Sequence, residues 1–174
     1  MSSVNHIQRE QTPVLLGAVI AAISAGFIPN ITMNASAAIV NCATVQPCTG
    51  TDSSDAISGT DNGETISGRG GGDAINARGG TDTVSGGPGG DSINGGGGND
   101  DLSGDAGSDA ITGGSGDDEL DGGDGNDSLS GGSGDDILTG GPGADRFQCG
   151  DGEDTITDFN AGEGDTMTED CEDF

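Results

Sequence analysis

The chain has 174 residues, and its 31 acidic residues against four basic ones give a formal net charge of −27 at pH 7. So acidic a chain excludes nucleic acid and anionic lipid as natural partners and favours metal cations. Glycine occurs 37 times and aromatic residues make up only 2% of the chain, so few large apolar side chains remain to build a core.

The amino-terminal 37 residues have the pattern of a secretory leader. An apolar run over 14–28 is too short to span a bilayer comfortably, and Ala35-Ser36-Ala37 is a small-x-small cleavage signal. We therefore expect a signal peptide at 1–37, Ala38 as the first mature residue, a secreted or cell-surface protein, and no stable membrane span after cleavage. An uncleaved, tilted anchor is the alternative, because the charge of Arg9 is offset by the acid beside it.

Residues 38–49 are expected to form a short amino-terminal cap that contains two of the four cysteines. An even number of cysteines in an exported chain predicts disulfides: Cys42, Cys48, Cys149 and Cys171. Three connectivities are open. Cys42 with Cys48 would close a small loop before the first repeat, and Cys149 with Cys171 would tie the tail to the last one. A zinc site is the weaker alternative, since the spacing matches no zinc pattern.

One nine-residue unit recurs twelve times over 50–157 without insertion or deletion. GGPGGDSIN at 86–94 and GGSGDDELD at 113–121 illustrate the consensus G-G-x-G-x-D-x-U-x, in which U is a large apolar residue. A fixed period of this kind predicts a solenoid. The last three residues of each unit should form a short strand with U pointing inward, and the first six should turn, with glycines at positions one, two and four admitting positive φ.

The sixth position is acidic in every copy. If two units make one turn, acids 18 residues apart stack roughly 5 Å from each other and repel unless a cation lies between them. Calcium accepts about six to eight oxygen ligands in a flexible geometry. Ions shared by loops two units apart would number at most ten. The predicted ligands are Asp55, Asp73, Asp82, Asp91, Asp100, Asp109, Asp118, Asp127, Asp136, Asp145 and Asp154.

The unit resembles the calcium-binding nonapeptide of the RTX (repeats-in-toxin) family, which forms a right-handed parallel β-roll. Six copies fit the consensus at every fixed position, those that begin at Gly86, Gly95, Gly113, Gly122, Gly131 and Gly140. Arg69, Arg78 and Asp105 depart from it at the second position. The resemblance implies an all-β, right-handed parallel β-roll of twelve repeats, about six turns long, that binds several calcium ions. The first two copies and the last fit worst, as expected of capping repeats.

Residues 158–174 should form a carboxyl-terminal cap. Asp158-Phe159 and Gly164-Asp165 resemble the segment that often closes RTX rolls, which implies that Phe159 covers the last layer of the core.

The mature sequence argues against an enzyme. Only residues 38–49 precede the roll, and the mature chain has no histidine, lysine, tyrosine or tryptophan to serve as a base or acid. We expect a calcium-binding roll that folds when it binds calcium and acts as a structural or interaction element of the extracellular layer. The alternatives are a disordered acidic coat protein that buffers calcium, or an ice- or mineral-binding protein, although the third positions carry no threonine ladder.

The outward-facing strand residues of alternate copies lie on two different faces of the predicted roll. One is predicted to hold three acids, Asp101, Glu119 and Asp121. The other lacks carboxylates and could pack against another copy of the chain or a surface partner. This carboxylate-free face comprises Ala56, Ser58, Ala74, Asn76, Ser92, Asn94, Ala110, Thr112, Ser128, Ser130, Arg146 and Gln148.

Overall fold

The computed structural model describes residues 37–43 and 47–171, and their secondary structure consists of strands and turns. Most of the predicted leader, and positions 44–46 of the predicted cap, lie outside these residues. Within the described part of the chain, no helix is long and apolar enough to cross a membrane.

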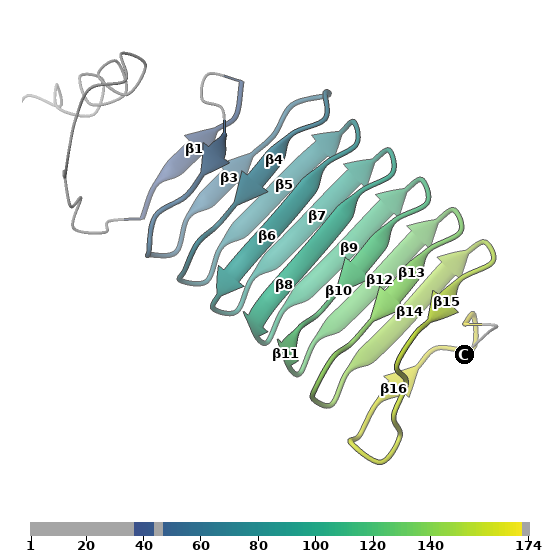
Figure 1. Ribbon diagram of the computed structural model, residues 1–174. Helices are drawn as coiled ribbons and strands as arrows, with labels where there is room; N and C mark the ends of the chain where they lie inside the picture. The colour runs from purple at the N-terminus through teal and green to yellow at the C-terminus, as the bar shows by residue number, and fades with distance from the viewer. Residues whose placement is uncertain (1–36, 44–46, 172–174) are drawn as a thin grey trace, which may run out of the picture. The chain divides into compact units, whose positions relative to one another are not determined.

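Two parallel sheets face each other and share the core (Figure 1). The first has the order β1-β3-β5-β7-β9-β12-β14-β16, from β1 (Ile39–Asn41), β3 (Ala56–Ser58), β5 (Ala74–Gly79), β7 (Ser92–Gly97), β9 (Ala110–Ser115), β12 (Ser128–Ser133), β14 (Arg146–Asp151) and β16 (Thr166–Met167). The second has the order β15-β13-β10-β8-β6-β4-β2, from β2 (Cys48–Thr49), β4 (Thr65–Ser67), β6 (Thr83–Pro88), β8 (Asp101–Gly107), β10 (Glu119–Asp121), β13 (Ile137–Thr139) and β15 (Thr155–Ile156). A short strand, β11 (Asp124–Gly125), pairs with β8.

The strand register confirms that two copies of the unit make one turn. Ile93 pairs with Ile111 and Leu120 pairs with Leu138, in each case 18 residues apart. Successive copies therefore alternate between the sheets. The carboxylate-free face lies on the first sheet and the three-acid face on the second, as the sequence predicts.

The roll has about seven turns, because the caps extend the six turns that the twelve repeats form. The predicted caps supply the additional strands. Val40 pairs with Ile57, Cys48 with Ile66, and Met167 with Phe147, so all three occupy the apolar eighth position. The loops of these outer turns lack the glycine consensus, so the repeat pattern did not predict these turns. Their strand residues nevertheless fit the two sheets.

The core is a double column of eighth-position side chains, one from each copy. Each of the twelve is at most 3% exposed: Ile57, Ile66, Ile75, Val84, Ile93, Leu102, Ile111, Leu120, Leu129, Leu138, Phe147 and Ile156. Val40 packs against one end, and Phe159 and Met167 pack at the other. The rings of Phe147 and Phe159 lie 6.3 Å apart, so Phe159 packs against the core at its carboxyl-terminal end.

Disulfides fasten both ends of the roll. Cys42 bonds to Cys48 and Cys149 bonds to Cys171, which confirms the prediction of disulfides and selects one of the three connectivities. One cysteine of each disulfide lies in a strand of the roll: Cys48 is in β2 and Cys149 is in β14. The crosslinks therefore join the cap segments directly to the sheets.

The strands extend further than the predicted three residues. β5, β7, β9, β12 and β14 each have six residues and run into the first three positions of the next copy. Gly96, for example, pairs with Gly114. The prediction that all six leading residues turn was therefore wrong, because loops that repeat at the same 18-residue interval can bond to one another as the strands do.

Glycine has different roles at different positions of the unit. Positions two and four have positive φ, as in Gly96 (φ 106°) and Gly98 (φ 119°). Position one does not, which corrects the prediction. A Cβ on Gly113 would instead lie 2.4 Å from Asp118 Oδ2, so this glycine is required by space.

Three of the five residues that replace glycine at position two keep the left-handed backbone. Arg69 has a φ of 81°, Arg78 of 80° and Asp105 of 71°. Such a conformation costs a residue with a Cβ about 1–2 kcal/mol, which the stacked neighbours must offset.

Two adjacent glycines test these roles. A Cβ on Gly80 would lie 2.3 Å from the carbonyl carbon of Asn62, and its φ is +113°, whereas a Cβ on Gly79 has no neighbour nearer than 3.5 Å. We expect Gly80→Ala to lower the free energy of unfolding in calcium by about 2 kcal/mol or more, and Gly79→Ala to change it by less than about 0.5 kcal/mol. Urea denaturation followed by circular dichroism measures both, and equal effects would contradict the assigned roles.

Candidate metal centre

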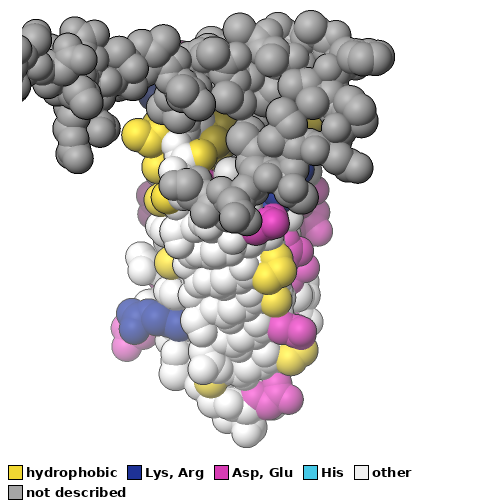
Figure 2. Space-filling view, turned by 90° about the vertical axis from the view of Figure 1, so that its left-hand side faces the viewer, with side chains coloured by type: hydrophobic (Ala, Val, Ile, Leu, Met, Phe, Trp, Pro, Cys, Tyr) yellow, Lys and Arg dark blue, Asp and Glu magenta, His cyan; other side chains and the backbone are white. Residues whose placement is uncertain are grey.

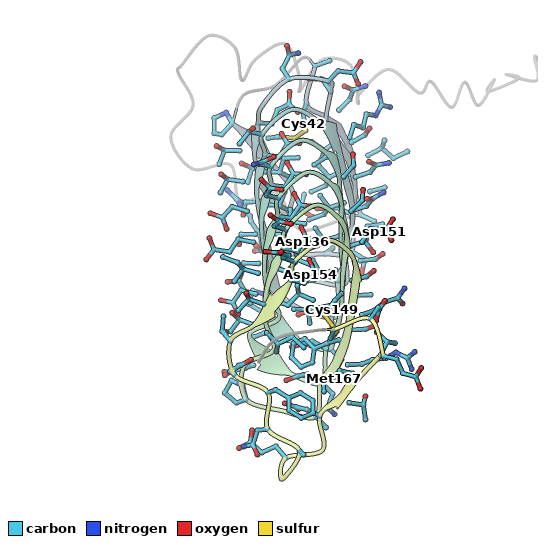
Figure 3. All side chains as sticks on the ribbon, turned by 90° about the vertical axis from the view of Figure 1, so that its right-hand side faces the viewer. Cys42, Asp136, Cys149, Asp151, Asp154 and Met167 are labelled. Atoms are coloured by element: carbon cyan, nitrogen blue, oxygen red, sulfur yellow. A yellow bond between two sulfur atoms is a disulfide. The ribbon has the colours of Figure 1, made fainter. Side chains whose placement is uncertain are left out.

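The acids at the sixth position form two columns inside the roll, each where the chain passes from one sheet to the other. The first column contains Asp55, Asp73, Asp91, Asp109, Asp127 and Asp145, and the second contains Glu64, Asp82, Asp100, Asp118, Asp136 and Asp154. All twelve are buried, and they include all eleven predicted ligands. Figure 3 shows Asp136 and Asp154 within the roll, whereas Asp151 lies on its outside.

Each column is held by hydrogen bonds between successive turns. The backbone N–H of one acid donates to Oδ1 of the aspartate 18 residues later, as from Asp73 to Asp91 (2.7 Å) and from Asp100 to Asp118 (2.9 Å). These bonds fix the orientation of each carboxylate in the folded roll. The stacking that the sequence predicts is confirmed.

The second oxygen of ten aspartates has no hydrogen-bond partner although it is buried. These Oδ2 atoms belong to Asp73, Asp82, Asp91, Asp100, Asp109, Asp118, Asp127, Asp136, Asp145 and Asp154. A buried polar atom without a partner costs about 1–3 kcal/mol, and a charged one costs more. Ten such atoms in one small roll indicate that a further group satisfies them.

Oxygen atoms from two successive turns converge beside seven of the ten unpaired Oδ2 atoms, those of Asp73, Asp91, Asp100, Asp109, Asp118, Asp127 and Asp136. A Cβ on Gly113 would lie 2.4 Å from Asp118 Oδ2 and 2.8 Å from the carbonyl oxygen of Gly131. A Cβ on Gly95 would lie 2.5 Å from Asp100 Oδ2 and 2.8 Å from the carbonyl oxygen of Gly113. The glycine at position one thus keeps open a space lined by a carboxylate and a carbonyl, both hard oxygen ligands of the kind that calcium prefers.

The carboxylates alone would not complete a coordination shell. No group of three or more histidine, cysteine, aspartate or glutamate side chains that could hold a metal occurs within residues 37–43 and 47–171. Calcium takes about six to eight oxygens. The remaining ligands of any calcium bound here would have to be backbone carbonyls or water.

The first acid of each column differs from the others. Asp55 Oδ2 accepts a hydrogen bond from Thr51 N (2.5 Å), and Glu64 Oε2 accepts one from Thr60 N (3.0 Å). The threonine hydroxyls donate to the other oxygens of the same carboxylates. Both threonines stand at position two, where most copies have glycine. In the first two copies the loop therefore satisfies its own carboxylate, and the predicted ligand Asp55 has partners on both oxygens.

Asp165 extends the first column, although the nine-residue period does not predict it. Asp165 is buried, its Oδ1 accepts from Asp145 N (2.9 Å), and its Oδ2 accepts from Asn160 N (2.8 Å). The signal was present in the sequence, since Asp165-Thr166-Met167 reproduces positions six to eight of the unit. The irregular loop before it broke the nine-residue period and hid the match.

A second, exposed row of polar side chains also escaped the sequence analysis. Asp117 N donates to Asn99 Oδ1 (3.2 Å), Asp135 N to Asp117 Oδ1 (3.1 Å), and Glu153 N to Asp135 Oδ1 (2.9 Å). This row lies at position five beside the second column; beside the first column, position five is bonded in the same way between Ala144 N and Asn126 Oδ1 (2.9 Å) and between Gly72 N and Ser54 Oγ (3.1 Å), without a carboxylate. The row beside the second column adds negative charge there, and Asp117 contributes to a raised pKa at Asp118.

Burial raises the pKa of the stacked aspartates. The pKa of Asp82, Asp109, Asp118 and Asp136 rises from 3.8 to about 6, mainly because burial removes the charged form from water, while the donating backbone N–H lowers it and the neighbouring carboxylates raise it further. Burial is likewise the main cause of a raised pKa at Asp73, Asp91, Asp100, Asp127 and Asp145.

The sign of these shifts predicts how the calcium-free roll depends on pH. A carboxyl whose pKa is about 6 when folded and about 3.9 when unfolded binds more protons in the folded state between these values. Stability should therefore rise as the pH falls from about 7 to about 4. In excess chelator, we expect circular dichroism to show more β structure at pH 5 than at pH 7.5. A loss of β structure over that range would contradict the buried stack.

Comparison with known protein families agrees with this geometry. The RTX calcium-binding nonapeptide repeat (4 copies) matches six overlapping segments: 58–93, 77–111, 85–120, 94–129, 112–147 and 121–156. Together they run from 58 to 156, more than half of the chain, and every aspartate with an unpaired Oδ2 lies within that span. A search of curated proteins found no match. No catalytic family was found. The chain belongs to the family of RTX calcium-binding nonapeptide repeat proteins, and its repeats imply that it binds calcium.

Proposed function

We propose that this protein is an exported calcium-binding β-roll in which calcium ions lie along the two columns of buried aspartates and complete its folding. The observation that carries the proposal is the set of ten buried, unpaired carboxylate oxygens, seven of which lie close to a backbone carbonyl oxygen of the next turn. Calcium would supply the positive charge and the additional coordination that these oxygens lack. RTX repeats are consistent with the metal identity.

The number of ions follows from which carboxylates are free to bind. Each column has five aspartates with an unpaired Oδ2, and five in a row make four consecutive pairs. One ion for each pair gives eight ions, within the upper limit of ten set by the repeat count. The difference arises at the amino end, where Thr51 and Thr60 already satisfy the first acids, so we do not retain Asp55 as a ligand.

The protein's own residues prepare each site. A backbone N–H fixes Oδ1 and leaves Oδ2 directed toward the space that the position-one glycine keeps open. The charge on the chain then resists folding until cations bind, because burial and the stacked neighbours disfavour the ionised carboxylates. Twelve eighth-position side chains give a core too thin to offset this cost alone.

The roll's surface suits a structural or interaction role outside the cell. Two disulfides favour an oxidising compartment. Of the described large apolar side chains, only Ile39 and Ile137 are exposed, and Figure 2 shows a surface that is mostly polar side chains and backbone. We infer that the carboxylate-free face on the first sheet, flat and lined with small residues, is the surface by which the calcium-loaded roll packs against another copy or a surface partner.

Folding should depend on calcium. We expect the secreted protein to show a coil spectrum in chelator at pH 7.5 and a β spectrum at about 0.1–1 mM calcium, the range typical of extracellular calcium modules. Magnesium at the same concentration is the control, since it prefers a smaller octahedral shell and retains water. An unchanged β spectrum in excess chelator at this pH would refute coupled folding.

One carboxylate in mid-column should serve two ions. Asp118→Asn keeps the Oδ1 acceptor for Asp100 N but replaces the unpaired Oδ2 by an amide. We expect native mass spectrometry to report two fewer calcium ions in this variant. Asp117→Asn is the matched control, because it removes the same charge from the adjacent exposed residue and should leave the number of ions unchanged. Equal losses in the two variants would show that overall charge, not the column, holds the ions.

A further inference from the structure

The amino-terminal end of the first column closes in an unusual way. Within the described residues, each aspartate of the column from Asp73 to Asp145 lies between two other carboxylates. Asp55 lies between Asp73 on one side and Ala38 on the other. The Ala38 nitrogen lies 2.5 Å from Asp55 Oδ1, and Ala38 O accepts from Ala56 N (2.9 Å). Ala38 thus stands where an acid of the preceding turn would stand, with no side-chain oxygen to offer.

The same residue is the one that leader cleavage is expected to make the first of the mature chain. Ala35 and Ala37 are the small residues that a signal peptidase recognises, and Ala37 is exposed whereas Ala38 is half-buried against the roll. The hydrogen-bonded roll therefore begins at the nitrogen that cleavage would release. The cleavage site expected from the leader sequence and the start of the strand pairing therefore coincide at the Ala38 nitrogen.

We propose that hydrolysis of the Ala37–Ala38 peptide bond creates the group that completes this end of the roll. A protease of the signal-peptidase type adds water across the bond, so the hydroxyl goes to the Ala37 carbonyl carbon and a hydrogen goes to the Ala38 nitrogen. The new amine takes up a proton at neutral pH, because α-amino groups are mostly ionised there. The resulting ammonium group of Ala38 forms an ion pair with Asp55.

This ion pair explains why Asp55 is satisfied differently from the carboxylates below it. Its oxygens accept from Thr51 and from Ala38, so a fixed positive charge takes the place that calcium holds elsewhere in the column. An uncleaved chain would still donate an amide N–H to Asp55 but would bring no charge. Charge-assisted hydrogen bonds are about twice as strong as neutral ones, so removal of the leader should stabilise the roll.

The first test is the position of the new amino terminus. The full chain is expressed with secretion, and the exported protein is analysed by intact mass and amino-terminal sequencing. We expect a chain that begins at Ala38. A chain that begins at any other residue, or retains the leader, would overturn the proposal.

The second test removes the charge without changing the sequence. All four basic residues of the chain are arginine and all four cysteines are in disulfides, so an acetylating reagent modifies the α-amino group alone. We expect acetylation of the exported, calcium-loaded protein to lower its melting temperature by about 2–4 °C. The acetyl amide keeps one N–H for Asp55, so the shift reports the charge.

Two variants make this result specific. In Asp55→Asn, acetylation should have no effect, whereas in Asp52→Asn, which loses an exposed charge of the same loop, it should have the same effect as in the wild type. An acetylation effect that persists in Asp55→Asn, or is absent from the wild type, would refute the ion pair. The number of calcium ions should not change on acetylation, so the assignment of the calcium columns can stand if this proposal fails.

Discussion

The fold depends on an unfavourable arrangement, a buried row of like charges with one oxygen of each carboxylate left unpaired. Ten such oxygens lie inside a roll whose core is two columns of single side chains. Glycines at position one make room beside eight of these oxygens, and backbone N–H groups hold the carboxylates in line. In the proposed function, binding and folding form one equilibrium because the buried charge and the bound cation stabilise each other.

The ends of the columns meet the same constraint without a metal. Thr51 and Thr60 bend their loops onto their own carboxylates, and Asn160 does so for Asp165 at the opposite end. Met167 and Phe159 close the apolar column beside them, and the disulfides hold both caps in place. A repeating structure needs such terminal turns, since each turn otherwise relies on a neighbour to satisfy its backbone and its charge.

Sequence reasoning succeeded where the chemistry repeats and failed where it does not. The period, the 18-residue stacking, the inward eighth position and the disulfides followed from residues such as Asp118 and Leu120, whose pattern recurs in every copy. The outer turns were missed because Val40, Cys48 and Met167 keep the strand pattern without the glycine loop. The role of glycine at position one could not be predicted from the sequence either. That role depends on the distance to the carboxylate five residues later and not on a backbone angle. That Asp55 has partners on both oxygens depends on Thr51, whose bonds only the folded loop reveals.

The 18-residue register also constrains how such a chain can change its length. Insertion or deletion of a single unit would move every later strand to the opposite sheet, so the residues of the carboxylate-free face downstream would exchange places with those of the acidic face. The exposed row at Asp117 and Asp135 would cross to the other edge of the roll as well. Loss or gain of two units leaves both faces, both edges and the closing bond between Cys149 and Cys171 as they were. Recombination between repeats should therefore preserve the surface pattern only when it proceeds in whole turns, and lengths that differ by an odd number of units would present a different surface from the same motif.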